Sequence, residues 1–223
     1  MADAFPSTMQ EWIMARLDVD GAGLQEVATH LMETYSRPLQ VYWLGSSFRT
    51  PEFEARDVVA GFFADRLSKP EWLQAWSSSG LRLRRWLMNG LLMYLHEQHR
   101  ATTRFNRLPE IALPNANENC DAAMEYDRAW ARQVVSNACD EAANRCRAAN
   151  LDTHWDLFRR HYLLGESYGD IVRSSRITAR QAEVRCRAAR SRFVAALRET
   201  LRQDGANEDE LDDEIRGLME VLG

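Results

Sequence analysis

Arginines recurring at helical spacing are the residues of this chain best suited to chemistry. Between residues 173 and 202 the chain holds nine arginines against Glu183 and Glu199, a local charge near +7, although the whole chain carries −5. A guanidinium group can donate two parallel hydrogen bonds to a phosphate or to guanine. Since almost no other reactive side chain accompanies these arginines, the pattern indicates recognition of a polyanion rather than catalysis.

Two short amphipathic helices are expected to position these arginines. Tyr168, Ile171 and Val172 lie at helical spacing before a turn, and Thr178 can cap a second helix whose apolar stripe runs to Leu197. This arrangement predicts a helix-turn-helix whose second helix enters the major groove of DNA. An arginine-rich amphipathic helix also fits a plain solvated surface. The candidate DNA contacts are Thr178, Arg180, Gln181, Glu183, Arg185, Arg187 and Arg190.

A second basic stretch, with aromatic side chains among its cations, lies between residues 82 and 104. Its aromatic rings could stack on unpaired bases while its cations hold phosphates. Trp86 and Tyr94 also fit a buried core, and the spacing favours the core for Trp86. The candidate residues of this stretch are Arg82, Arg84, Arg85, Trp86, Tyr94, His99, Arg100 and Arg104.

Helical periodicity recurs along the whole chain, which predicts an all-α protein of two small helical domains joined by a linker. Proline and asparagine are frequent in the predicted linker. We expect the helix over 24–44 to be interrupted near Pro38. The predicted parts are a helical bundle over 1–104, a linker over 105–120, a helix-turn-helix domain over 121–203 and an acidic helix over 204–223.

Several classes of protein are not expected from the composition. No apolar run reaches the roughly 18 residues of a membrane span and no secretion signal is visible, so we expect a cytoplasmic protein without membrane insertion. The four cysteines lack metal-ligand spacing, and His96 and His99 lack a third ligand, so we expect buried free thiols and neither a metal nor a cofactor. No catalytic triad or phosphate loop stands out, and an enzyme is not expected.

Taken together, these segments resemble a bacterial sigma factor of the extracytoplasmic-function type. The segment ARDVVAGFFADRL (55–67) is similar to the polymerase-binding helix of sigma region 2, and GLRLRRWLMNGLLMYLHEQHRA (80–101) to the helix that handles the −10 element. GESYGDIV (165–172) and QAEVRCRAARSRF (181–193) are similar to region 4, which reads the −35 element. The acidic C-terminal helix is typical of one variety of these factors.

The resemblance implies a transcription initiation factor that directs core RNA polymerase to promoter DNA. Asp57, Phe62 and Arg66 would contact the polymerase, although Phe62, Phe63 and Leu67 also share one helical face that fits a core. An anti-sigma protein is a further partner that such factors can have. Catalysis would belong to the polymerase.

Three departures from the family pattern keep two alternatives open. Ala60 and Gly61 replace polar residues of the polymerase-binding helix, which fits a helix-turn-helix regulator that does not bind core polymerase. Glu183 replaces a common lysine on the recognition helix. That acid either changes base preference by accepting from cytosine or indicates a degenerate protein-interaction module.

The last predicted helix is strongly acidic. Eight carboxylates face one cation, Arg216, between residues 204 and 223, a local charge near −7. Its apolar stripe must be buried somewhere, and the neighbouring basic domain is the nearest surface. We therefore expect this tail to dock on the helix-turn-helix domain, either as a competitor of DNA or as a structural cap.

Overall fold

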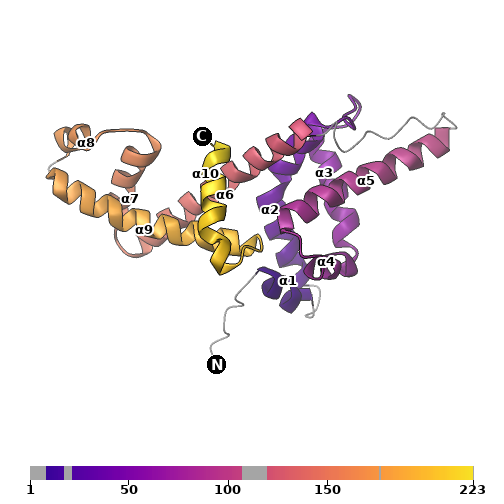
Figure 1. Ribbon diagram of the computed structural model, residues 1–223, viewed down its shortest axis with the longest axis horizontal. Helices are drawn as coiled ribbons and strands as arrows, with labels where there is room; N and C mark the ends of the chain where they lie inside the picture. The colour runs from indigo at the N-terminus through magenta and orange to yellow at the C-terminus, as the bar shows by residue number, and fades with distance from the viewer. Residues whose placement is uncertain (1–8, 18–21, 107–119, 176, 223) are drawn as a thin grey trace. The chain divides into compact units, whose positions relative to one another are not determined.

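The computed structural model describes residues 9–17, 22–106, 120–175 and 177–222, and these ranges contain helices and turns without a strand (Figure 1). The prediction of an all-α protein is therefore confirmed. Among the described helices, none combines the length and apolar character that crossing a bilayer requires. The helices are α1 (Met9–Leu17), α2 (Ala22–Gly45), α3 (Ala55–Leu67), α4 (Pro70–Ser77), α5 (Leu83–Asn106), α6 (Cys120–Ala148), α7 (Asp152–Phe158), α8 (Tyr168–Ser174), α9 (Ala179–Gln203) and α10 (Leu211–Leu222).

The chain divides into two compact units. Unit 1 comprises residues 1–133 and 202–223, and unit 2 comprises residues 134–201. These ranges differ from the predicted parts, because the first half of α6 and the whole tail group with the N-terminal helices. The predicted linker lies mostly outside the described residues.

Unit 1 is built on α2, which packs against α1, α3 and α5. The helix continues through Pro38, so the expected interruption there is wrong. Tyr35, Leu39 and Tyr42 around the proline are all buried, and this packing outweighs the hydrogen bond that a proline cannot donate. α1 was not predicted, and its Ile13 is fully buried.

An aromatic cluster joins α3, α4 and α5. The Phe62 ring lies 5.9 Å from Trp72 and 6.1 Å from Tyr94, between ring centroids. Gly90 permits this packing, because a Cβ atom there would lie only 2.6 Å from the Trp72 ring. These three helices therefore share a core at the face where α5 carries Trp86 and Tyr94.

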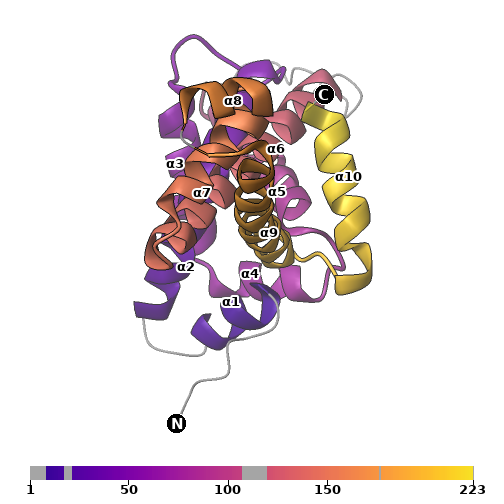
Figure 2. The same cartoon turned by 90° about the vertical axis from the view of Figure 1, so that its left-hand side faces the viewer.

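Unit 2 holds the two helices predicted around the turn. Leu157 of α7, Ile171 of α8 and Cys186 of α9 share one buried cluster, and α7 and α8 lie beside the N-terminal part of α9 in Figure 2. A second cluster joins Cys146, Phe158 and Ala189. Between α7 and α8 runs a π-helical turn, η2 (Arg159–Leu163).

The tail does not dock where the sequence analysis expected. α10, with the short 3₁₀ turn η3 (Glu208–Glu210) before it, belongs to unit 1 rather than to the basic unit 2. Leu211 and Leu218 are its buried residues, while Met219 is 60 % exposed. The expected docking on the helix-turn-helix domain is therefore wrong. The physical reason is that arginines at the start of α5 form ion pairs with the tail.

Candidate functional site

The start of α9 is fixed by a reciprocal pair of hydrogen bonds. The Thr178 hydroxyl accepts from the Gln181 backbone N–H at 3.2 Å, and the Gln181 side-chain oxygen accepts from the Thr178 N–H at 2.9 Å. This capping box confirms that Thr178 caps the helix, whereas its predicted contact with DNA stays a prediction. It also occupies the Gln181 side chain, which was predicted to contact bases.

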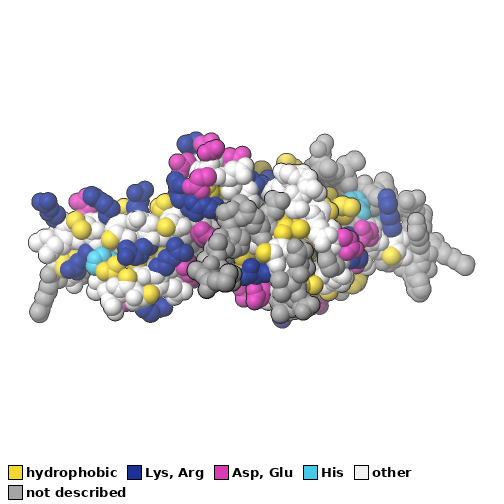
Figure 3. Space-filling view, turned by 90° about the horizontal axis from the view of Figure 1, so that it is seen from below, with side chains coloured by type: hydrophobic (Ala, Val, Ile, Leu, Met, Phe, Trp, Pro, Cys, Tyr) yellow, Lys and Arg dark blue, Asp and Glu magenta, His cyan; other side chains and the backbone are white. Residues whose placement is uncertain are grey.

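One face of α9 is exposed and basic. Ala182, Cys186 and Ala189 are buried on one side of the helix, and successive turns on the opposite side present the predicted contacts Arg180, Glu183, Arg187 and Arg190. Figure 3 shows arginine side chains of unit 2, in dark blue, on the surface of the molecule.

The exposed face of α9 contains one ion pair. Arg187 contacts Glu183 one turn earlier, at 2.7 Å. Within the described ranges Arg180 and Arg190 form no ion pair, so both guanidinium groups are available to an anion. Arg185 lies on the flank of the helix, where it lines a pocket together with Asp152 and Asp156 of α7.

Charge is distributed unequally between the two units. Residues 134–201 contain twelve arginines and eight carboxylates, a formal charge of +4, whereas the whole chain carries −5. Unit 2 is therefore basic although the chain as a whole is acidic.

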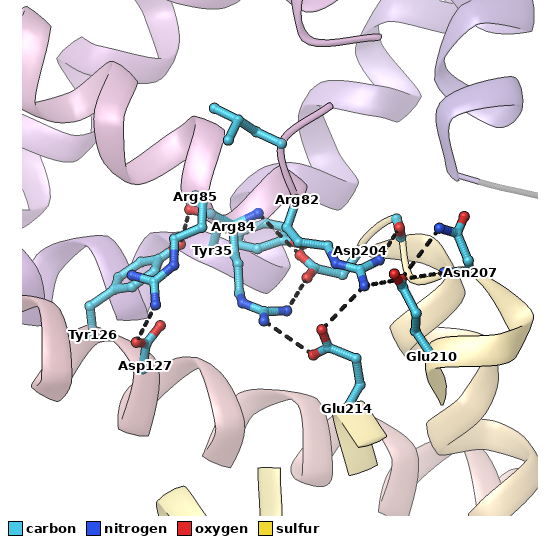
Figure 4. A network of polar contacts seen from close by, with 12 residues as sticks. Tyr35, Arg82, Arg84, Arg85, Tyr126, Asp127, Asp204, Asn207, Glu210 and Glu214 are labelled. Atoms are coloured by element: carbon cyan, nitrogen blue, oxygen red, sulfur yellow. Dashed lines mark hydrogen bonds and ion pairs between the residues drawn. The ribbon is translucent and has the colours of Figure 1, made fainter. Parts of the chain in front are cut away.

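In unit 1, a buried carboxylate connects three segments that are distant in sequence (Figure 4). Asp204, only 2 % exposed, accepts from the Tyr35 hydroxyl at 2.5 Å, from the Arg84 backbone N–H at 3.1 Å and from the Arg84 guanidinium at 2.7 Å. The carboxylate thus caps the start of α5 and neutralises its arginine. Burial raises the pKa of Asp204 above its usual range, and the charge of Arg84 opposes this shift.

A second layer of carboxylates from the tail covers the same arginines. Glu214 bridges Arg82 at 3.3 Å and Arg84 at 3.1 Å, and Glu210 pairs with Arg82. The Arg84 guanidinium also lies 4.2 Å from the centre of the Trp130 ring of α6. These contacts explain why the tail belongs to unit 1.

The third arginine of the network pairs with α6. Arg85 contacts Asp127 at 2.8 Å, and the hydroxyl of the neighbouring Tyr126 donates to the Arg84 backbone carbonyl at 2.8 Å. Every candidate arginine between residues 82 and 85 therefore has an acidic partner within the chain.

The remaining candidates of α5 do not form one surface with these arginines. Trp86 packs on Trp72, and Tyr94 packs on Phe62 and lies where a side chain at Gly61 would meet its hydroxyl. His99 and Arg100 lie about 20 Å further along the helix, at 1.5 Å per residue. The Arg104 side chain lies outside the described residues.

The predicted polymerase contacts on α3 are placed unequally. Asp57 is exposed in the first turn of the helix, whereas Phe62 is fully buried. Arg66 is also buried and pairs with Glu97 of α5 at 2.8 Å. Phe62 and Arg66 therefore hold α3 in its unit, and only Asp57 of the three is presented to solvent.

Sequence reasoning missed Tyr35 and Asp127, and it treated Asp204 only as part of an acidic tail. No spacing rule connects Tyr35 to Asp204, which are 169 positions apart. The one available signal was the matching of charge between Arg82, Arg84 and the tail, which was assigned to the wrong basic segment.

The described residues contain no group of three or more histidine, cysteine or acidic side chains that could hold a metal ion. Cys146 and Cys186 are buried free thiols, as predicted, whereas the free thiol of Cys120 is exposed. Comparisons of the chain with protein-family models, curated proteins and solved structures found no match.

The buried position of Asp204 predicts a large loss of stability on its removal. Asp204→Ala removes the buried counter-charge of Arg84 and the cap of α5. We therefore expect the free energy of unfolding to fall by about 3–5 kcal/mol. Asp204→Asn keeps the hydrogen-bond acceptor for Tyr35 and should cost less. Urea unfolding of both variants measures this, with the exposed Asp209→Ala as control, which should stay within about 0.5 kcal/mol of the parent. Equal losses in Asp204→Ala and Asp209→Ala would contradict the assignment.

Proposed function

We propose that this chain is a sigma-type initiation factor that brings core RNA polymerase to promoter DNA. In this proposal α8 and α9 form a helix-turn-helix, and α9 enters the major groove at the −35 element. Unit 1 provides the contacts to polymerase and to the −10 region. Chemistry is left to the polymerase, and the factor contributes affinity through phosphates and discrimination through base edges.

The observation that carries the proposal is the exposed face of α9. Arg180 and Arg190 extend from it with no ion-pair partner in the described part of the chain, on a helix whose start is fixed by a capping box. A rigid helix with free guanidinium groups suits a groove lined with phosphates and with guanine acceptors. The net charge of +4 on residues 134–201 supports the same ligand, because phosphate contacts dominate protein–DNA affinity.

The burial of Phe62 and Arg66 favours a second candidate. With only Asp57 exposed among the three predicted contacts, the polymerase contact that the resemblance implies on α3 is reduced to one side chain. A regulator that binds duplex DNA through α9 and does not bind the polymerase would need no such surface. Reconstituted transcription with core enzyme on a genomic promoter library separates the two, because only an initiation factor supports transcripts that are absent with core enzyme alone.

The two free arginines of α9 should differ in their effect on DNA binding. Arg180, in the first turn of the helix, was predicted near base edges, and Arg180→Ala should lower affinity on the order of tenfold to a hundredfold at one base position only. Arg190→Ala should weaken all sequences alike and reduce the salt dependence by about one phosphate contact.

Titrations of labelled duplexes by fluorescence anisotropy at several salt concentrations measure both effects. Arg147→Ala is the matched control, since it removes an exposed arginine of unit 2 that lies on α6 and contacts only Asn144. The same loss for Arg147→Ala as for Arg180→Ala would mean that α9 is not the DNA-contacting helix.

Polymerase binding should depend on Asp57. Asp57→Arg places a cation where the resemblance expects an acid, and we expect at least a tenfold loss of affinity for core enzyme. Glu71→Arg is matched in charge and also lies in the first turn of a helix, α4, so it carries the same cost to the helix dipole. If the two variants co-purify with core enzyme equally, α3 is not the polymerase contact and the regulator becomes the better assignment.

A further inference from the structure

We propose that Arg82 and Arg84 form a phosphate-binding site for single-stranded nucleic acid, and that the tail carboxylates Glu210 and Glu214 occupy it in the free protein. Nucleic acid and tail then compete for the same two guanidinium groups. This inference deepens the proposed function, on which it rests for the presence of DNA as a ligand.

The geometry of Glu214 is the first support. Its two oxygens lie 3.3 Å from an Arg82 nitrogen and 3.1 Å from an Arg84 nitrogen, so one anionic group bridges two guanidinium groups. Glu210 adds a second anion on Arg82. Two neighbouring phosphates of a nucleic acid strand present the same charges to two arginines, and a phosphate accepts the same bidentate hydrogen bonds as a carboxylate.

The contacts form an inner and an outer layer that differ in exposure. The Asp204 side chain is 3 % exposed and is held by Tyr35 as well as by Arg84. By contrast, the side chains of Glu214 and Glu210 are 19 % and 50 % exposed. The Glu210 pair is therefore the weakly held one, because exposed ion pairs contribute little to stability. Glu214 and its arginine partners are only 15–21 % exposed, so Glu214 leaves when a phosphate takes its place on the guanidinium groups, while Asp204 stays.

The surroundings of the arginines give a strand room to approach. An open pocket of about 470 Å³ lies beside them, between α5 and α6 on one side and α10 on the other. Arg82, Arg84 and Arg85 line it together with Trp130, while Glu210 and Glu214 line it from the tail. α10 buries Leu211 and Leu218 and partly buries Ile215 and Leu222, whereas Met219 and Val221 are exposed, so its departure must uncover the first four side chains.

The test measures binding of a short single-stranded DNA to the full chain by fluorescence anisotropy. All proteins carry Arg180→Ala and Arg190→Ala, so that the basic face of α9 contributes little. The variant Glu210→Gln/Glu214→Gln removes the outer layer and keeps Asp204. The control Asp209→Asn/Glu220→Gln removes two charges from exposed tail residues that contact no arginine.

We expect the Glu210→Gln/Glu214→Gln protein to bind the strand at least tenfold more tightly than the control protein, most strongly at low salt. Adding Arg82→Ala should abolish that gain. An equal change in both double variants would reduce the effect to net charge and overturn the proposal, as would no gain in a variant whose thermal unfolding matches that of the parent.

A second measurement uses the parent protein and is therefore informative even if a variant folds poorly. In the parent protein, saturating single-stranded DNA should accelerate tryptic cleavage after Arg216, because the strand displaces the tail; unchanged cleavage at saturation overturns the competition. Neither assay contains polymerase. A gain in strand affinity without transcription in the reconstituted system would therefore refute the initiation factor while upholding the site.

Discussion

Unit 1 depends on one buried carboxylate. The Asp204 carboxylate accepts from the Tyr35 hydroxyl, the Arg84 guanidinium and the Arg84 backbone N–H, so a single buried side chain satisfies three donors. An unpaired ion at such a depth is strongly unfavourable. Without Asp204, Arg84 would keep only Glu214 as a carboxylate partner among the described residues. The segment that carries Asp204 must therefore pack against the N-terminal helices.

This constraint decides which arginines are available for ligands. Those at the start of α5 are committed to carboxylates of the chain itself, whereas Arg180 and Arg190 on α9 have none among the described residues. Two basic segments that look alike in the sequence therefore differ in how their charges are paired. In the functions proposed above, the face of α9 binds an anion directly, and the face of α5 must first lose a competitor.

Periodicity was sufficient to predict the helical class, the helix over 24–44 to within two residues at each end and the capping residue Thr178, because these depend on neighbours within a few positions. The path of α2 through Pro38 was not predictable in this way, since burial of Tyr35, Leu39 and Tyr42 decides it. The docking of the tail failed for the same reason. The charge of the tail indicated an arginine-rich partner, but the chain has two arginine-rich segments. Only the contacts of Asp204 with Tyr35 and Arg84 distinguish the two.

The distance along the chain between Arg84 and Asp204 has a consequence for synthesis. The two residues are 120 positions apart, so at about 5–20 residues per second the ribosome makes Asp204 roughly 6–24 s after Arg84. Residues 134–201 emerge within that interval and can fold first, although they come later in the chain than most of unit 1. Completion of the packing around Tyr35 and Arg84 therefore waits for the synthesis of Asp204, and a chain released before that point lacks the carboxylate that joins these two residues.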